Sequence, residues 1–170
     1  MTIRPLVAAN AALFQALRLR GLLECPTAFA SSHAEEVNLD LATVAQRITA
    51  RADRAIFGAF DASALVAIVG VQREAMVKLA HKAFLWGVYV APEARGQGVG
   101  ARLLQHALGY AAASLKVRQV KLGVNTGNEA AIALYERLGF VTYGVERDYL
   151  LVDGVLHDEC QMVATIQSRE

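Results

Sequence analysis

Apolar and polar residues alternate along the chain with two different periods. Short apolar runs rich in β-branched residues predict strands, and segments whose apolar residues recur every three or four positions predict helices. The strands expected in this way are residues 2–7, 54–60, 65–73, 83–90, 119–124, 140–152 and 155–164. The expected helices are residues 8–23, 41–51, 99–115 and 128–138, and residues 27–33 are expected to form a polar loop.

Turn-forming residues set the connections between these elements. Asp61-Ala62-Ser63 and Asp153-Gly154 each join two predicted strands and favour hairpins, and Gly139 stands where the last helix should end. Antiparallel strands therefore fill the first half of the chain, and strand–helix–strand units fill its centre. The sequence predicts a mixed α/β fold in which a mostly antiparallel, twisted sheet of about seven strands carries about four helices on its faces.

Composition narrows the class of protein. The chain has 170 residues, which suits a single domain over residues 1–170, and its 55% hydrophobic content excludes intrinsic disorder. A formal net charge of +1 gives no electrostatic footprint for nucleic acid or an anionic membrane, so neither partner is expected. No apolar run reaches the roughly 18 residues of a membrane span, and no secretory signal follows Met1. Cys25 and Cys160 lack disulfide or metal spacing, so we expect two buried, small apolar side chains in a cytoplasmic protein.

A glycine-rich turn, residues 95–100, lies between a predicted strand and a predicted helix. Glycines let the backbone approach a ligand closely, and the helix start offers unpaired N–H groups that suit a phosphate. A nucleotide-binding Walker A loop is excluded because no Gly-Lys-Ser/Thr is present. Gly96, Gly98 and Ala101 satisfy the dinucleotide pattern GxGxxA, but the next strand lacks the acidic residue that binds ribose, and only about 75 residues follow. A tight turn without a ligand is the structural alternative.

The third interpretation of this turn is a coenzyme A site. Arg95, Gly98 and Gly100 fit the pattern Arg/Gln-x-x-Gly-x-Gly/Ala. The strand before the turn reads Leu85-Trp86-Gly87-Val88-Tyr89-Val90, and the helix after it reads Asn128-x-x-Ala131-x-x-Leu134-Tyr135-x-x-x-Gly139-Phe140. With these two segments, the turn resembles two conserved blocks of the GNAT superfamily of N-acetyltransferases. The element order over essentially the whole chain is similar too. The resemblance implies an acetyl-CoA-dependent enzyme.

The resemblance assigns the cofactor contacts. The helix-start argument and the family agree that backbone N–H groups hold the pyrophosphate, here those of Gln97, Gly98, Val99, Gly100 and Ala101. Arg95 would pair with a phosphate oxygen or remain a solvated surface charge. The backbone of Val88 and Val90 would pair with the peptide-like pantetheine arm, beside a neighbouring strand that splays away. Gly87 would mark the bulge that starts this splay.

The second block supplies the catalytic candidate. A phenol has a pKa near 10, so Tyr135 keeps its proton at pH 7 and can donate it to a leaving thiolate, the role that the resemblance implies. The alternative is a tyrosine that only packs against the sheet. Asn128 lies two helical turns earlier, about 10 Å away on the same stripe, and would contact the pantetheine, cap the helix, or do both.

The general base and the amine acceptor are less well defined. The strand over residues 84–90 contains no acidic residue, which puts the family's fourth-strand glutamate in doubt. A water chain or one of Glu24, His33, Glu35 and Glu36 would have to serve. The segment from Cys25 to Glu36 is similar to one that borders the acceptor cleft in bacterial members, so Phe29 and Glu35, with Asn125, are candidate acceptor contacts. The alternative is a capping loop with Phe29 docked in the core. The histidines show no metal-binding spacing, so no metal is expected.

These inferences combine into one functional hypothesis. The chain is expected to transfer an acetyl group from acetyl-CoA to a primary amine on a small molecule or peptide, by direct attack in a ternary complex. Neither cysteine lies in the two cofactor motifs, which argues against an acetyl-cysteine intermediate. The alternative is an inactive acyl-CoA sensor with the same fold. A homodimer formed through residues 155–164 is a further expectation from the resemblance.

Overall fold

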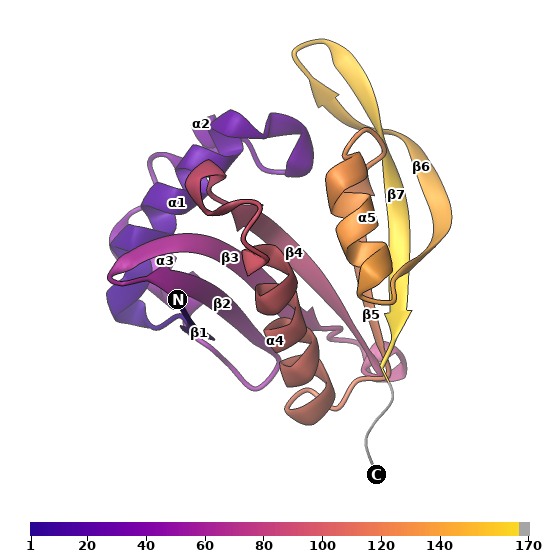
Figure 1. Ribbon diagram of the computed structural model, residues 1–170, viewed down its shortest axis with the longest axis horizontal. Coiled ribbons are helices and arrows are strands. Elements are labelled where there is room, and N and C mark those ends of the chain that lie inside the picture. The colour runs from indigo at the N-terminus through magenta and orange to yellow at the C-terminus, as the bar shows by residue number, and fades with distance from the viewer. Residues whose placement is uncertain (167–170) are drawn as a thin grey trace.

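A single seven-stranded sheet organises the molecule (Figure 1). The computed structural model describes residues 1–166. The strands are β1 (Thr2–Pro5), β2 (Arg54–Asp61), β3 (Ala64–Arg73), β4 (Lys82–Val90), β5 (Gln119–Asn125), β6 (Val141–Val152) and β7 (Val155–Thr165), in the spatial order β1-β2-β3-β4-β5-β7-β6. Every neighbouring pair is antiparallel except β4 and β5. The predicted mixed, mostly antiparallel sheet of seven strands is confirmed.

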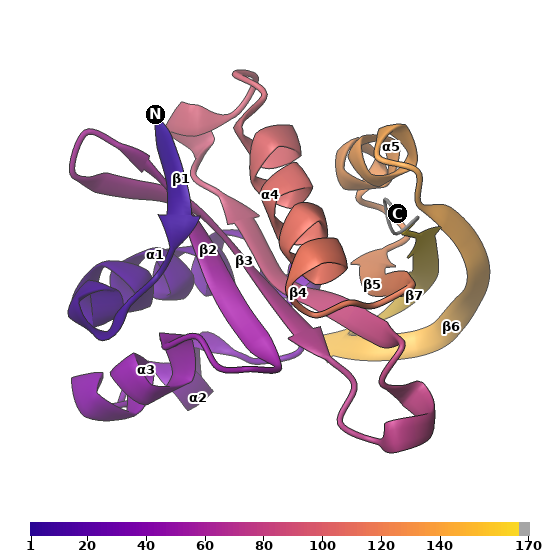
Figure 2. The same cartoon turned by 90° about the horizontal axis from the view of Figure 1, so that it is seen from below.

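Helices cover both faces of this sheet (Figure 2). The α-helices are α1 (Ala11–Glu24), α2 (His33–Glu36), α3 (Leu41–Ile48), α4 (Val99–Ala113) and α5 (Glu129–Arg137). Helices α1 to α3 lie on one face, and α4 and α5 lie on the other. Short 3-10 turns lie in the connections between elements, at Ala8–Asn10, Pro26–Ala28, Val77–Leu79 and Pro92–Ala94. In the described part of the chain, no helix combines the length and apolar character that crossing a bilayer requires.

The predicted turns are confirmed, and one helix was missed. Asp153 and Gly154 both have positive φ, as a tight hairpin between β6 and β7 requires, and Gly139 ends α5 with φ +89°. The expected loop over residues 27–33 is wrong at its end, because α2 begins at His33. Ser32 and Glu35 form a capping box that stabilises this short helix. The described residues therefore form five α-helices, where about four were expected.

Two hydrophobic layers hold the helices on the sheet. Phe57, Val69 and Val71 pack on the α4 side against buried residues of that helix, Leu103, Leu104 and Ala107. Ile56 and Ile68, from the same two strands, point to the opposite face and pack with Phe14 of α1 and Ile48 of α3. The central strands β2 and β3 are therefore buried on both faces, which explains why they read as nearly continuous apolar runs.

Strands β4 and β5 separate shortly after they begin. They pair only from Lys82–Phe84 to Gln119–Lys121. On the other side of β4, Ile68 pairs with Tyr89 and Gly70 with Trp86, so the single residue Val69 faces two residues of β4, Gly87 and Val88. This bulge needs a left-handed residue, and Gly87 has φ +63°. The bulge at Gly87 and the splay expected from the resemblance are both present.

A buried ion cluster joins the three helices of the first face. Arg18 of α1 donates from Nε and Nη2 to the Glu36 carboxylate of α2, at 3.1 and 2.9 Å, and Arg47 of α3 lies 3.2 Å from the same group. Burial alone would raise the pKa of Glu36, but the Arg18 hydrogen bonds and the charges of Arg18 and Arg47 outweigh it and hold this pKa below its ordinary value. The carboxylate thus fixes where α2 sits.

We expect Glu36→Gln to lower the free energy of unfolding at pH 7 by about 3 kcal/mol or more, because two guanidinium groups lose their buried partner. Glu36 has a lowered pKa in the folded state, so its contribution is present above the unfolded value near 4.3 and is lost as pH falls through the folded value. In urea titrations, the difference in free energy of unfolding between wild type and variant should therefore be smaller at pH 3 than at pH 7. Glu136→Gln, at an exposed carboxylate, is the control. A loss below about 1 kcal/mol at pH 7 would contradict a structural role for this ion pair.

Candidate active site

The glycine-rich turn leads directly into the start of α4. Gly96 and Gly98 have φ of +74° and +71°, so the turn uses the left-handed conformations that glycine adopts without strain. Gly98 caps α4 without a side-chain hydrogen bond, and the first helical bond runs from Arg102 N–H to Gly98 O, at 3.1 Å. The N–H groups of Val99, Gly100 and Ala101 therefore have no helical partner and point out of the positive end of the helix dipole.

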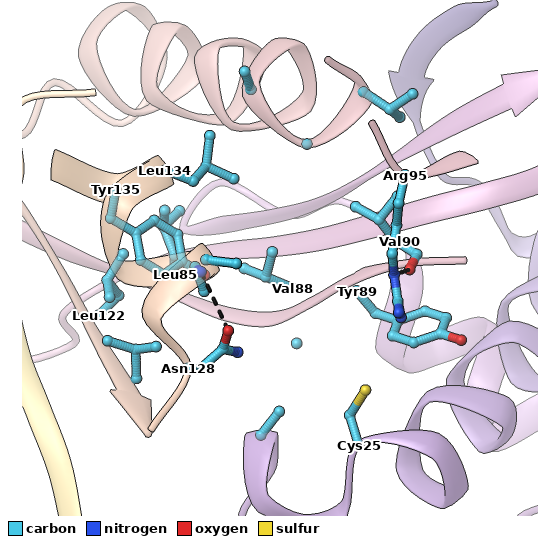
Figure 3. A pocket seen from close by; sticks show the side chains of 18 of the residues that line it. Cys25, Leu85, Val88, Tyr89, Val90, Arg95, Leu122, Asn128, Leu134 and Tyr135 are labelled. Carbon is cyan, nitrogen blue, oxygen red and sulfur yellow. Dashed lines mark hydrogen bonds between the residues drawn. The ribbon is translucent and has the colours of Figure 1, made fainter. Parts of the chain in front are cut away.

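A cavity of about 620 Å³ opens beside this turn, where β4 and β5 separate. We call it the larger cavity. Figure 3 shows Tyr135, Leu85 and Leu122 at one end of it and Tyr89, Val90 and Arg95 at the other. Its volume is in the range of pockets for cofactors and other small molecules. The predicted residues that line it are Val88, Val90, Arg95, Gly98, Val99, Gly100, Ala101, Asn125, Asn128, Tyr135 and Phe29.

The side chains of Arg95 and Gln97 both form hydrogen bonds within the protein, while the contact predicted for Gln97 is its backbone N–H. The Arg95 side chain donates from Nε to the backbone oxygen of Val90, at 2.9 Å, and stacks over the Tyr89 ring. Gln97 does not line the larger cavity, and its side chain donates to the Glu93 oxygen at 3.0 Å. The side chains of Val88 and Val90 pack against the hydrophobic core, so the backbone of β4 is the polar surface that this strand offers to the gap.

Tyr135 and Asn128 reach the larger cavity from α5. Tyr135 is 6% exposed and packs edge-on against Phe140, with ring centroids 5.8 Å apart. Burial raises the pKa of Tyr135 to about 12, so the phenol keeps its proton throughout the neutral range. Asn128 caps α5 by accepting from Ala131 N–H at 3.2 Å, which is the capping role considered for it. Its amide nitrogen makes no hydrogen bond among the described residues and remains a donor on the cavity wall (Figure 3).

A smaller cavity, of about 430 Å³, adjoins the larger one across the same gap. The two cavities share residues of β4 and β5 and the loop after α1, which are Ala28, Phe29, Leu85, Trp86, Gly87, Leu122 and Gly123. The smaller cavity also receives side chains from α1, α3, β6 and β7, and much of its wall is aromatic, from Phe29, Phe84, Trp86, Tyr143 and Tyr149. The gap between β4 and β5 therefore connects two pockets of different chemistry.

Glu159 of β7 is the one carboxylate that lines either cavity within the described residues. It pairs in register with Asn125 of β5 and lies over Gly123, where an added Cβ would meet its Oε1 at 1.9 Å. Gly123 thus provides the space for the carboxylate. Burial raises the pKa of Glu159. The hydrogen bond from Gln161 Nε2, at 2.8 Å, partly lowers this pKa, and the negative charge of Glu146 raises it further. A carboxylate with a raised pKa is a better proton acceptor.

The residues that sequence analysis offered as acceptor contacts or bases are placed differently. Phe29 is buried in the core, which confirms the alternative considered for it, and it also lines both cavities, so it stays a candidate acceptor contact. Glu35 lines neither cavity, because its carboxylate accepts hydrogen bonds from Ser32 in the α2 cap. Asn125 lines the larger cavity but accepts from Gly127 N–H at 2.8 Å.

The other proposed bases are also engaged or displaced. Glu24 accepts from the Tyr89 hydroxyl and from Arg20, and Glu36 belongs to the buried ion cluster. His33 starts α2 and lines neither cavity. The residue that sequence analysis missed is Glu159. Its signal was an acidic side chain within a predicted strand, where it follows a second acid, Asp158.

The expectation that both cysteines are buried is wrong for Cys160, which is partly exposed, and also for Cys25. This residue is partly exposed and lines the larger cavity, with its sulfur drawn in Figure 3. The thiol follows the last turn of α1, where the backbone N–H of Cys25 bonds to the Gly21 oxygen. Across the described residues, no group of three or more His, Cys, Asp or Glu side chains is arranged to hold a metal ion.

Comparison with known proteins decides the family. The model of the Acetyltransferase (GNAT) family matches residues 19–140, which include the end of α1, the glycine turn and all of α5. The chain belongs to the GNAT family. The resemblance inferred from the two sequence motifs is confirmed.

Curated relatives match part of this GNAT chain. The N-alpha-acetyltransferase RimI of Mycobacterium tuberculosis is 42% identical over 65 residues, which are 38% of this chain and 39% of that protein. The chain thus spans about two fifths of the length of this curated relative.

Solved structures of other GNAT proteins share the whole fold. A ribosomal-protein-alanine N-acetyltransferase from Brucella melitensis superposes with a TM-score of 0.85 at 23% identity, covering 98% of this chain and 100% of that one. A phosphinothricin acetyltransferase from Sinorhizobium meliloti, solved in complex with AcCoA, gives 0.83 at 23% identity over 97% and 88% of the two chains. At these identities the likeness establishes the fold.

Proposed function

We propose that this chain is an N-acetyltransferase that moves the acetyl group of acetyl-CoA to a primary amine. The observation that carries the proposal is the gap between β4 and β5, which connects a cavity beside a free helix N-terminus to a second cavity containing a carboxylate. Membership of the GNAT family supports acetyl-CoA as the co-substrate. The N–H groups of Val99, Gly100 and Ala101 would hold the pyrophosphate, with Gln97, Gly98 and Arg95 beside them, and β4 would pair with the pantetheine arm.

The residues around the gap suit direct attack in a ternary complex. Glu159 would take one proton from the acceptor ammonium, directly or through a water molecule, and release it to solvent. The neutral amine nitrogen then forms a bond to the thioester carbon as the C–S bond breaks. Tyr135 would donate its proton to the departing sulfur and regain one derived from the amine nitrogen. Each turnover thus converts an ammonium and a thioester into an amide, a thiol and one released proton.

Tyr135→Phe separates an enzyme from a sensor that only binds acyl-CoA. The wild type is expected to bind acetyl-CoA and not NADPH in calorimetric titrations, and to release thiol only when an amine is added. The variant should bind acetyl-CoA with nearly unchanged affinity while kcat falls about 100-fold, because the leaving thiolate loses its proton donor. Tyr110→Phe, on α4 outside both cavities, is the matched control.

Equal kcat in the Tyr135 variant would exclude Tyr135 as the acid. Acetyl-CoA binding without amine-dependent thiol release from the wild type would favour the sensor. Absence of acetyl-CoA binding would remove the proposed function altogether.

Glu159→Gln tests the proposed base. At neutral pH its kcat/KM should be about 100-fold lower than that of wild type, because a protonated amine can no longer lose its proton to the carboxylate. The deficit should shrink as pH approaches the acceptor pKa near 10, since a neutral amine needs no base. Glu136→Gln, at an exposed carboxylate of α5 that lines neither cavity, serves as the control. A deficit that stays constant from pH 7 to 10 would assign Glu159 a role in binding alone.

We also propose that the chain forms a homodimer. β6 is the edge strand beyond β7, and it exposes Val141, Tyr143 and Val145, so this end of the sheet has apolar surface for a second copy. Strand β7, over which the sequence placed the contact, already pairs on both sides. Sedimentation velocity should give a dimer mass that Tyr143→Lys lowers to the monomer. A monomer in the wild type would end this proposal.

A further inference from the structure

The wall of the smaller cavity carries more positive charge than its carboxylates neutralise. Arg18 and Arg47 both line this cavity, and both pair with the single carboxylate of Glu36. One carboxylate balances one guanidinium, so the cluster keeps one positive charge. Lys121 of β5 lines the same cavity and forms no ion pair among the described residues; its Nζ lies 5.6 Å from the centre of the Tyr143 ring.

The donors of this cluster are only partly used. Arg18 binds Glu36 through Nε and Nη2, while its Nη1 has no hydrogen-bond partner and lies 3.7 Å from the position a Cβ would take on Gly87. The Arg18 side chain is 4% exposed, so its charge acts on the cavity mainly through the electrostatic potential. The Arg47 side chain is 32% exposed and contacts Glu36 through Nη1, so its guanidinium can reach a ligand directly.

We propose that the smaller cavity binds an amino acid, with its ammonium toward Glu159 and its carboxylate toward Arg47 and Lys121. This inference rests on the proposed function, because it names the acceptor of the same site. The carboxylate would meet the surplus positive charge, and Arg47 can bind it through two parallel hydrogen bonds. Glu146 and Tyr149 also lie close enough to Glu159 to interact with its charge, and neither is a cation that would compete for the substrate carboxylate.

The same charges argue against a polyamine acceptor. A second ammonium group on the substrate would face Arg47 and Lys121 and be repelled. The cavity volume of about 430 Å³ suits one amino acid, and the aromatic wall formed by Phe29, Trp86 and Tyr149 offers apolar surface to its side chain. The charge and the lining therefore favour a small amphoteric acceptor over a long cationic one.

The test compares α-amino acids with the amines obtained by removing only the α-carboxylate. Leucine is paired with isopentylamine, phenylalanine with 2-phenylethylamine, and glutamate with 4-aminobutyrate, with spermidine as a polyamine. Thiol release from acetyl-CoA gives kcat/KM for each. At least one amino acid should exceed its partner amine by about tenfold or more, the gain expected for one charge-assisted hydrogen bond. Spermidine should be a poorer acceptor than that amino acid.

Two variants locate the carboxylate. Arg47→Gln and Lys121→Gln should each reduce the ratio of kcat/KM for the amino acid to kcat/KM for its partner amine, and the change should lie mainly in KM. Arg51→Gln, an exposed arginine that lines neither cavity, should leave the ratio as it is in wild type. Circular dichroism and urea titration would check that the Arg47 variant, which also loses an ion pair to Glu36, is folded; Lys121 has no such structural partner.

The outcomes distinguish this inference from the proposed function. If spermidine or the partner amines are acetylated as well as or better than every amino acid, the acceptor assignment is wrong while acetyl transfer stands. If the ratio is high but unchanged in both variants, the carboxylate does not bind at Arg47 or Lys121, and the placement is overturned. If the protein acetylates no amine, the proposed function fails and this inference with it.

Discussion

The early separation of β4 from β5 is the constraint on which the site depends. Two neighbouring strands of one sheet normally satisfy each other's backbone groups along their whole length. Here three residues pair, and the bulge at Gly87 then turns the remainder of β4 away while its pairing with β3 continues to Val90. The backbone edge that β4 loses from the sheet is left facing a cavity. An extended, amide-containing ligand can restore those hydrogen bonds, which is the physical reason why a pantetheine arm suits this gap.

The same separation places the rest of the machinery. The chain leaves the end of β4 through the glycine turn into α4, and it leaves the end of β5 into α5 (Figure 1). Arg95 of the glycine turn and Tyr135 therefore stand at opposite ends of one cavity (Figure 3). Acidic and basic side chains meet in the smaller cavity, where Glu159, Arg47 and Lys121 line the wall, whereas the charged residues that line the larger cavity are the basic Arg95 and Arg137. Under the proposed function this difference gives the gap a direction, with the thioester on the side of α4 and the amine on the side of α1 and α3.

Local and long-range features of the molecule differed in how far the sequence revealed them. The strands, the hairpin at Asp153-Gly154 and the glycine turn depend on neighbouring residues, and each was predicted. Glu159 could not be placed in the same way, because its position depends on the register between β5 and β7, which brings it over Gly123 from far along the chain. Glu35 shows the opposite error. A functional role was considered for it, but its carboxylate serves the local cap with Ser32, an S-x-x-E pattern that was visible in the sequence. The pairing of Arg18 with Glu36 likewise required the packing of α2 on α1.

The placement of Cys25 bears on the chemical route. A thiol on the wall of the larger cavity would permit an acetyl-cysteine intermediate, so its presence there has to be weighed against direct attack. The intermediate requires a thiolate, which forms where positive charge or a helix N-terminus stabilises it. Cys25 lies between the C-terminal end of α1 and the 3-10 turn Pro26–Ala28. The adjacent Glu24 adds a negative charge and already accepts hydrogen bonds from Tyr89 and Arg20. Glu159 and Tyr135 both border the gap between β4 and β5, so the proposed proton acceptor and proton donor would flank the position where an amine meets a thioester. This arrangement supports the proposed transfer in a single step.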